Sequence, residues 1–127
     1  MDCLPHIHVA AIHAEAGYET YTPGIGVFCR ETNTILGAGV YLNSEKTKPR
    51  LESKYAFVGY QPFRVDDWKV GAIIGVVDNY SKYNYGWGPL AGIAASKPTS
   101  FGETHLMFVP KTKYSPTLVQ ISFTIRY

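Results

Sequence analysis

The sequence has few charged residues. Asp, Glu, Lys and Arg make up 17% of its 127 residues, against about 25% in typical soluble domains. The formal net charge is only +2, so the composition gives no basis for binding a nucleic acid polymer. The chain also lacks the charge blocks and low hydrophobicity that are typical of disordered segments. A folded domain is therefore expected.

Long hydrophobic runs and targeting signals are missing as well. No window holds 18 consecutive apolar residues, which excludes a transmembrane helix. The segment that starts at Met1 has no basic region, apolar core or small-residue cleavage site of a secretory signal peptide. If Met1 is the natural start, we expect a cytoplasmic protein. If an N-terminal signal has been removed, the outer membrane is the alternative.

Cysteine is scarce, with two residues in the chain. Cys3 and Cys29 could approach each other at the base of a first β-hairpin. Two cysteines do not, however, make the disulfide framework of a small secreted domain. In a reducing compartment both would be free thiols, and we expect that form.

Aromatic and turn-forming residues are plentiful. Aromatics reach 14%, with 10 Tyr, and the chain holds 12 Gly and 8 Pro. Neither an internal repeat nor a linker divides the chain, and its length is typical of one domain. Residues 1–127 are therefore expected to form a single domain.

Short β-rich stretches alternate with turn residues, and helical periodicity is almost absent. The pattern predicts eight strands: Ile7–Ala14, Gly24–Cys29, Thr34–Leu42, Tyr55–Gln61, Lys69–Val77, Gly86–Ala95, Thr104–Val109 and Leu118–Tyr127. Regular short strands with such turns predict an all-β fold, an eight-stranded antiparallel up-and-down β-barrel.

The strands have one apolar and one uncharged polar face. In the last strand, Val119, Ile121 and Phe123 alternate with Gln120 and Ser122. The apolar face would be the core of a soluble barrel, but it would meet lipid in an outer-membrane barrel. Several predicted strands are shorter than the about 9–11 residues that cross a membrane. We therefore favour a soluble barrel whose uncharged outside is covered by other copies in a homo-oligomer, and the orientation of the faces stays open.

A series of short motifs runs along the chain in order. They are Ala11–Ala14, Tyr21–Gly26, Gly39–Ser44, Ala56–Arg64, Val70–Tyr80, Pro89–Ala91, Phe108–Pro110 and Phe123–Tyr127. Their order resembles the outer-membrane lipid A palmitoyltransferases, the PagP family. The resemblance covers residues 9–127 and implies an eight-stranded barrel with phospholipid:lipid A acyltransferase activity. A weaker likeness extends to short phage proteins of the same pattern.

The resemblance implies a catalytic site at the end of the first and third strands. It places the catalytic histidine at His13 and the serine at Ser44, with Asn43 where the family has Asp. A Ser–His pair is the minimum for nucleophilic or general-base chemistry. Asn43 can orient an imidazole by a hydrogen bond, but it cannot offset the positive charge as Asp does. The alternative interpretation is that Ser44 starts a polar turn and His13 packs at the rim.

The other histidines form a second pattern. His6 and His8 project to one face of the first strand, and His105 lies in the seventh. A His-x-His pair can bind a metal but needs a third ligand, which the spacing does not imply. We expect terminal or rim histidines, no bound metal and no cofactor.

Cationic and aromatic residues gather in the loops that follow the odd-numbered strands. The predicted ligand-binding residues are Tyr21, Tyr41, Lys46, Lys48, Arg50, Tyr80, Tyr85, Trp87 and Lys111. Aromatic faces beside cations at a barrel mouth suit a small anionic, planar ligand. The alternative is a solvated loop with aromatics folded over the barrel end.

Two functions of different classes follow, and the sequence leaves open whether the protein is an enzyme. The first is a small cytosolic PagP-like barrel that sequesters or degrades a small anionic, nucleotide-like signalling ligand, as a phage counter-defence (anti-defence) protein would. The alternative is an outer-membrane phospholipid:lipid A acyltransferase that uses His13 and Ser44. A purely structural barrel is a third possibility, which no specific feature favours.

Overall fold

The secondary-structure elements of the described residues are all β-strands. The computed structural model describes residues 1–13, 18, 20–43, 51–79, 84, 86–110 and 117–126. The strands are β1 (Asp2–His13), β2 (Tyr21–Glu31), β3 (Thr34–Leu42), β4 (Glu52–Val65), β5 (Trp68–Val77), β6 (Gly88–Thr99), β7 (Gly102–Val109) and β8 (Leu118–Ile125). Within these ranges, no helix has the length and hydropathy needed to cross a bilayer.

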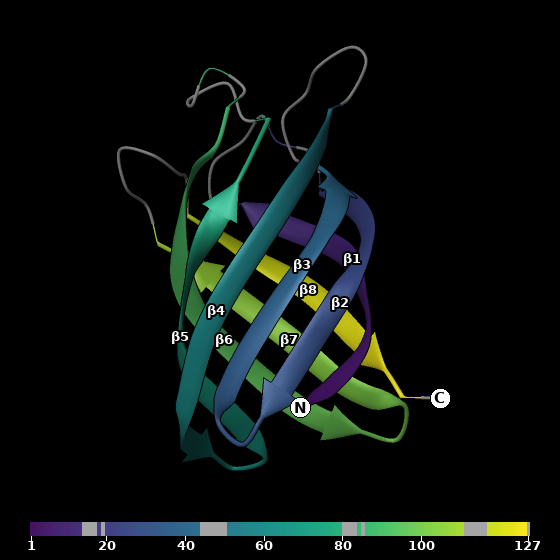
Figure 1. Ribbon diagram of the computed structural model, residues 1–127, viewed down its shortest axis with the longest axis vertical. Helices are drawn as coiled ribbons and strands as arrows, with labels where there is room; N and C mark the ends of the chain where they lie inside the picture. The colour runs from purple at the N-terminus through teal and green to yellow at the C-terminus, as the bar shows by residue number, and fades with distance from the viewer. Residues whose placement is uncertain are drawn as a thin grey trace.

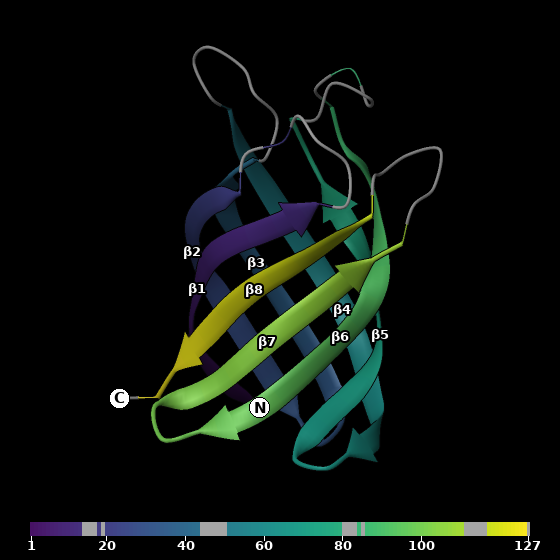
Figure 2. The ribbon, with the colours of Figure 1, turned by 180° about the vertical axis from the view of Figure 1, so that it is seen from behind.

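The strands form one closed barrel, as Figures 1 and 2 show. Each strand pairs antiparallel with the next, and β1 closes the barrel by pairing with β8. The predicted all-β, up-and-down architecture is therefore confirmed. Only the bounds of β3 match the prediction at both ends. β4, for example, extends beyond the predicted Tyr55–Gln61 at both ends.

The two ends of the barrel differ. At one end, two-residue turns join β2 to β3, β4 to β5 and β6 to β7. The first residues of two of these turns, Thr32 and Asp66, have left-handed φ values of 55° and 54°, as tight hairpins require. Both chain termini also lie at this end, the turn end (Figure 1). At the opposite end, the loop end, the odd-numbered strands finish and the longer connections begin.

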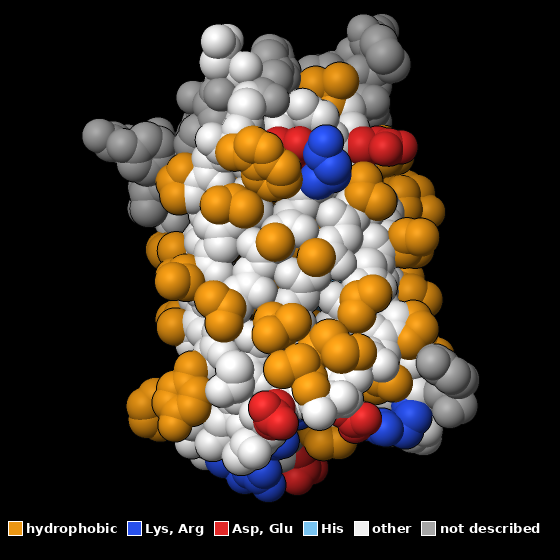
Figure 3. All heavy atoms as spheres, in the orientation of Figure 1, with side chains coloured by type: hydrophobic (Ala, Val, Ile, Leu, Met, Phe, Trp, Pro, Cys, Tyr) orange, Lys and Arg blue, Asp and Glu red, His pale blue; other side chains and the backbone are white. Residues whose placement is uncertain are grey.

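The apolar face of the strands points outward. In β8, Gln120, Ser122 and Thr124 are buried. The exposed apolar side chains, 37–68% accessible, form an apolar belt around β1 to β7: Ile7, Ile12, Ile25, Val27, Leu36, Val58, Ile74, Val76, Ile93 and Phe108. On the face in Figure 3, hydrophobic side chains occupy the middle, and charged side chains gather toward the two ends.

The strands are also longer than the sequence indicated. Six of the eight contain 9 to 14 residues, and only β7 and β8 contain 8, so the expectation that several strands are too short for a membrane is wrong for most of the barrel. Closing a barrel staggers the strands and carries pairing past the apolar run of each strand. Polar and charged residues at the strand ends, such as Glu52 and Arg64, are therefore part of the paired ladder.

The prediction of free thiols is wrong. Cys3 on β1 lies directly opposite Cys29 on β2, and the two form a disulfide. The sequence placed them near the same hairpin but did not fix the register that makes them direct partners. The bond joins two strands next to the site of barrel closure.

The lumen is apolar on one side and polar on the other. Phe28, Ile35, Ile73 and Ala94 form a buried cluster, with Phe57 and Met107 against it. β1 and β8 instead bury mainly polar side chains, which are histidine, glutamine, serine and threonine, together with Ala11. A narrow barrel thus holds a half-polar interior, which positions the candidate site.

Candidate functional site

The predicted catalytic residues lie at the loop end. The His13 ring stacks on Tyr18, with the ring centroids 4.2 Å apart. Asn43 is fully buried, and its side chain donates a hydrogen bond of 2.8 Å to the carbonyl of Asn79. Asn43 therefore ties the end of β3 to the segment after β5. Ser44 lies outside the described residues, so the proposed pair with His13 stays a prediction.

Three of the predicted ligand-binding residues are described. Tyr21 and Trp87 are exposed. Tyr41 is half-buried and turns into the barrel, with its ring centroid 5.7 Å from that of His8. The remaining predicted residues lie outside the described part of the chain: Lys46, Lys48, Arg50, Tyr80, Tyr85 and Lys111. The basic and aromatic rim is thus still a prediction.

The prediction that His6, His8 and His105 are terminal or rim residues is wrong. All three are buried in the lumen, where they form a histidine cluster. The ring centroids of His6 and His8 are 4.3 Å apart, and those of His6 and His105 are 5.4 Å apart. The cause is that β1 starts at Asp2 rather than at the predicted Ile7, and β7 at Gly102 rather than at the predicted Thr104. His6 and His8 therefore occupy alternate, inward positions inside a strand.

One hydrogen-bonded chain runs through His8 and His6. The Gln120 side-chain amide donates to Nδ1 of His8 (3.4 Å), and His8 Nε2 donates to the Tyr55 hydroxyl (2.5 Å). Tyr55 donates to Nδ1 of His6 (3.3 Å), and His6 Nε2 donates to Oγ of Ser122 (2.8 Å). An amide nitrogen can only donate, so the direction of every later bond is fixed. Each imidazole then carries one proton, on Nε2.

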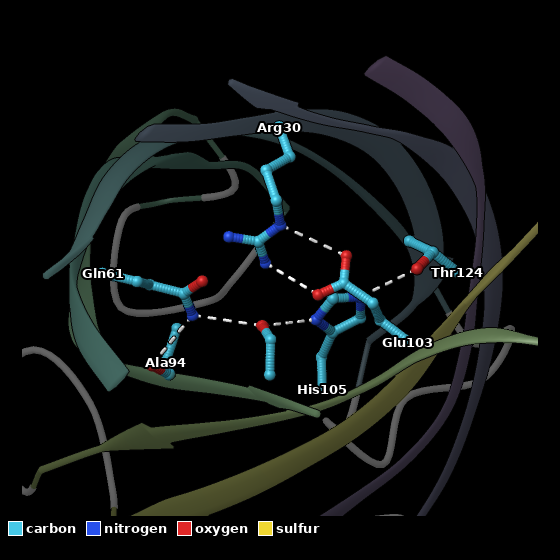
Figure 4. Close-up of polar contacts among 7 residues, drawn as sticks. Arg30, Gln61, Ala94, Glu103, His105 and Thr124 are labelled. Carbon is cyan, nitrogen blue, oxygen red and sulfur yellow. Dashed lines mark hydrogen bonds and ion pairs between the residues drawn. The ribbon is translucent and has the colours of Figure 1, made fainter. Parts of the chain in front are cut away.

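A second chain runs through His105 (Figure 4). Gln61 Nε2 donates to the Ala94 carbonyl (3.0 Å) and to Oγ of Ser96 (3.1 Å). Ser96 donates to Nδ1 of His105 (2.7 Å), whose Nε2 donates to Oγ1 of Thr124 (3.2 Å). All six ring nitrogens of the histidine cluster therefore have partners. The cluster acts as a polar scaffold of the interior rather than as a set of free bases.

Two glycines make room for the hydroxyl at the centre of the first chain. A Cβ atom added at Gly26 or at Gly39 would lie 2.7 Å from the Tyr55 hydroxyl oxygen. Both glycines also lie close to the backbone of the neighbouring strand. Glycine is required at these inward positions because the tyrosine packs so closely against them.

Little empty space remains beside the histidine cluster. A cavity of about 50 Å³ lies between it and the apolar side chains Phe28, Phe57 and Ile73. Among the described residues, no three or more His, Cys, Asp or Glu side chains are arranged to hold a metal ion. A space of this size with polar groups on one side suits a few water molecules.

An ion pair crosses the lumen near the turn end. Arg30 on β2 donates two hydrogen bonds, of 2.9 Å and 3.3 Å, to the Glu103 carboxylate on β7. β1 and β8 lie between these strands in the barrel, so the pair bridges the interior rather than neighbouring strands. Each side chain is 14% exposed. Outside the pair lies a space of about 240 Å³, the turn-end vestibule, lined by Asp2, Leu4, Phe28, Arg30, Thr32, Lys69, Glu103 and Arg126.

The sequence did not predict this pair, because each of its residues lies one position outside the predicted strand. The predicted second strand ended at Cys29, and the predicted seventh began at Thr104. The alternation of the strands does indicate that both side chains face inward, because Arg30 lies two residues after Phe28 and Glu103 lies two residues before His105.

The wall of the barrel has a lateral groove toward the loop end. The β1–β2 register shifts between His8 and Ala10, so that a bulge interrupts the ladder. A groove of about 510 Å³ lies there, lined by outward side chains such as Ile7 and Ile25 and also by the inward-facing His8 and Tyr41. The groove therefore connects the apolar outside of the wall with the edge of the histidine cluster.

No protein-family model and no curated protein matches the chain. The structure defines a class of protein, the closed eight-stranded antiparallel β-barrel. This architecture is the one that the resemblance to PagP implies.

Proposed function

We propose that the protein is a membrane-embedded β-barrel that acts on membrane lipid at its loop end. The observation that carries this proposal is the apolar belt around a polar, hydrogen-bonded lumen. In water, contiguous apolar surface beyond a few hundred Å² is rare on a monomer. In a bilayer the same belt is the expected exterior, and alternating lumen-facing positions are polar.

Aromatic and charged side chains near the two ends support a membrane setting. Exposed aromatics lie near the loop end at Tyr21 and Trp87, and near the turn end at Tyr60, Phe63 and Phe101. Aromatic residues are enriched at both membrane–water interfaces. Exposed charges lie at or beyond these levels: Glu31, Arg64, Asp66 and Asp67 at the turn end, with Glu52 and Lys54 at the loop end.

The lengths of the connections and the disulfide also support a membrane setting. Outer-membrane barrels have short turns at one end and longer loops at the other, and this barrel has the same asymmetry. The Cys3–Cys29 disulfide is of a kind that persists in oxidising compartments rather than in the cytosol. These features favour the outer membrane over the cytoplasm.

A membrane setting favours lipid acyl transfer over nucleotide binding. The lateral groove offers an acyl chain a route from the apolar outside toward Tyr41 and His8. In the proposed reaction, a fatty acyl group leaves the ester oxygen of a phospholipid and forms an ester with a hydroxyl of a second lipid. His13 accepts the proton of that hydroxyl and returns it to the lysophospholipid oxygen, and Ser44 is its proposed partner at the same rim. This assignment of the two residues continues the resemblance to PagP.

Purification in parallel with and without detergent tests the membrane proposal. We expect a folded monomer in detergent, flotation with phospholipid vesicles, and precipitation once detergent is removed. A stable detergent-free oligomer would overturn the proposal and favour the cytosolic binder of a small anionic ligand. In that event the same sample is incubated with nucleotides, and their binding and integrity are followed by chromatography.

Acyl transfer is then assayed in mixed micelles of phospholipid and lipid A, with mass spectrometry of both lipids. We expect His13→Ala and Ser44→Ala to lose product to a similar degree, and the double variant to lose little more, because residues that act as a unit are not additive. The matched control is His105→Ala, because His105 lies inside the lumen and away from this rim. Equal activity in wild type and both rim variants would reject the site.

A further inference from the structure

The Arg30–Glu103 ion pair closes the lumen at the turn end. We propose that this pair is a gate on a hydrated path through the barrel, which admits water and small monovalent ions when the pair opens. The inference rests on the proposed membrane setting, because only a barrel in a bilayer joins two compartments. It concerns the lumen and not the loop-end chemistry.

The pair lies at the boundary between two spaces. Phe28 lines both the inner cavity beside the histidine cluster and the turn-end vestibule. The Arg30 guanidinium lies over the Phe28 ring, 5.6 Å from its centroid. Arg30, Glu103 and Phe28 therefore form one layer between the cavity and the vestibule.

Several buried polar atoms along the lumen need partners that the described residues do not supply. They are Oγ1 of Thr22, Oγ of Ser53, Oε1 of Gln61 and Nη1 of Arg30. Thr22 and Ser53 lie near the loop end, and Arg30 near the turn end. Buried polar groups of native proteins bond to protein or to ordered water. We infer that water molecules lie beside these atoms, at the loop-end and at the turn-end level of the lumen, and that opening of the gate joins the two levels.

Two polar atoms next to the pair itself point to water there. In Figure 4 the Gln61 amide lies on the side of the Arg30 guanidinium that faces away from Glu103. Nη1 of Arg30 is a donor and Oε1 of Gln61 an acceptor, and neither has a partner among the described residues. We infer that water bonds to these atoms, because water both accepts and donates. The inner side of the gate therefore has polar groups beside the Phe28 ring.

The path continues as a polar stripe along one wall. β8 turns Gln120, Ser122 and Thr124 inward at alternate positions, and each bonds to a ring of the histidine cluster. The stripe runs from the loop-end half of the lumen down to the level of Glu103, which pairs in register with Thr124. Hydroxyl, amide and imidazole groups along one side give water and ions continuous hydrogen-bonding partners.

The vestibule offers the pair a second arrangement. Asp2, Lys69 and Arg126 also line it, and Asp2 and Arg126 contact each other at 3.6 Å. Asp2 is the register partner of Arg30 on the neighbouring strand, so its carboxylate is an alternative acceptor for Arg30. Lys69 and Arg126 are alternative cations for Glu103. Both members of the gate have long side chains, so each can exchange its partner across the lumen for a partner at the mouth. Two alternative pairings of this kind make a two-state element.

Conductance across a planar bilayer of phosphatidylcholine and phosphatidylglycerol in potassium chloride tests the gate. We expect wild type to stay mostly closed. We expect Arg30→Ala/Glu103→Ala to conduct about tenfold more, since a bidentate charged pair no longer holds the closed state. The charge exchange Arg30→Glu/Glu103→Arg rebuilds the pair and should restore low conductance.

The matched control is Glu31→Gln. Glu31 lies at the same end of the barrel and pairs with the N-terminal amino group of Met1 at 3.8 Å, but its side chain is exposed and does not line the vestibule. Removing its charge leaves the gate and its alternative partners intact, so conductance should stay near wild type. Glu103→Gln removes one charge with almost no change of shape, and it should conduct between wild type and the double alanine variant.

Flotation with vesicles separates the two proposals. Wild type that does not float rejects the membrane setting, and the gate with it. If the variants float and their gel mobility shifts on heating as for wild type, equal conductance of wild type, Arg30→Ala/Glu103→Ala and Glu103→Gln rejects the gate alone. Should the double alanine variant fail to fold, Glu103→Gln and the charge exchange decide the question.

Discussion

At the scale of single residues, Tyr55 has the most demanding role in the lumen. Its hydroxyl accepts a hydrogen bond from His8 and donates one to His6. It reaches both partners only because Gly26 and Gly39 carry no side chain. The hydroxyl thus passes on to His6 the proton order that the Gln120 amide sets at His8.

Replacing Tyr55 by Phe should destabilise the barrel. The change leaves the ring in place but deprives two buried imidazoles of a partner, at a cost of about 1–3 kcal/mol for an unsatisfied buried group. Guanidinium unfolding of the protein in detergent, followed by tyrosine and tryptophan fluorescence, measures the loss. Tyr60→Phe is the matched control, because Tyr60 is exposed. An equal effect of both variants would contradict the proposed role of the hydroxyl.

At the scale of strands, alternation along the sequence predicted the number, order and approximate position of the elements. The predicted strand bounds were wrong where a charged residue continues the inward face of a strand, as Arg30 does on β2 and Glu103 on β7. Single-chain alternation carries no information about which residue of another strand lies across the lumen. Neither the ion pair nor the Cys3–Cys29 bond was predictable, because both depend on the register of a closed barrel. The histidine cluster was not predicted for a related reason, because His6 lies before the predicted start of its strand.

The disulfide should add measurable stability to the β1–β2 hairpin. It joins residues 26 positions apart, and a loop of that length corresponds to about 3 kcal/mol of lost denatured-state freedom. Reduction should therefore lower the midpoint of guanidinium unfolding. Cys3→Ala/Cys29→Ala should unfold at the reduced midpoint with or without reductant. A reductant effect that persists in this variant would have to come from another cause.

At the scale of the whole molecule, the faces of the sheet are reversed relative to a soluble barrel. The sequence displayed the alternation but not its direction, because an apolar face packs equally well against a core or against lipid. The structure gives the direction: inward positions combine glycine, serine and threonine with larger histidine, tyrosine and phenylalanine side chains, and together these fill the lumen of an eight-stranded barrel.

A charge placed in the belt should report the depth of its position in a bilayer. Ile74 is 63% exposed and pairs with Val58, another belt residue. Ile74→Lys should cost about 2–4 kcal/mol in phospholipid vesicles, whereas Val65→Lys at the turn end should cost about 0–1 kcal/mol. Val65 is a fair control because it is 60% exposed. Unfolding in vesicles measures both, and equal costs would contradict a lipid-facing belt.

The pairing of β1 with β8 has a consequence for how the chain folds. His6 pairs with Thr124, so the final seam joins the two extremes of the polypeptide. Contacts between residues so far apart in the sequence form late, because closing the chain costs conformational entropy before the contacts can stabilise the fold. Until that seam forms, the sheet keeps two open edges that can capture a neighbouring chain. The vulnerable state of this protein is therefore the almost complete sheet, and an interrupted or shortened last strand should lead to aggregation rather than to a smaller barrel.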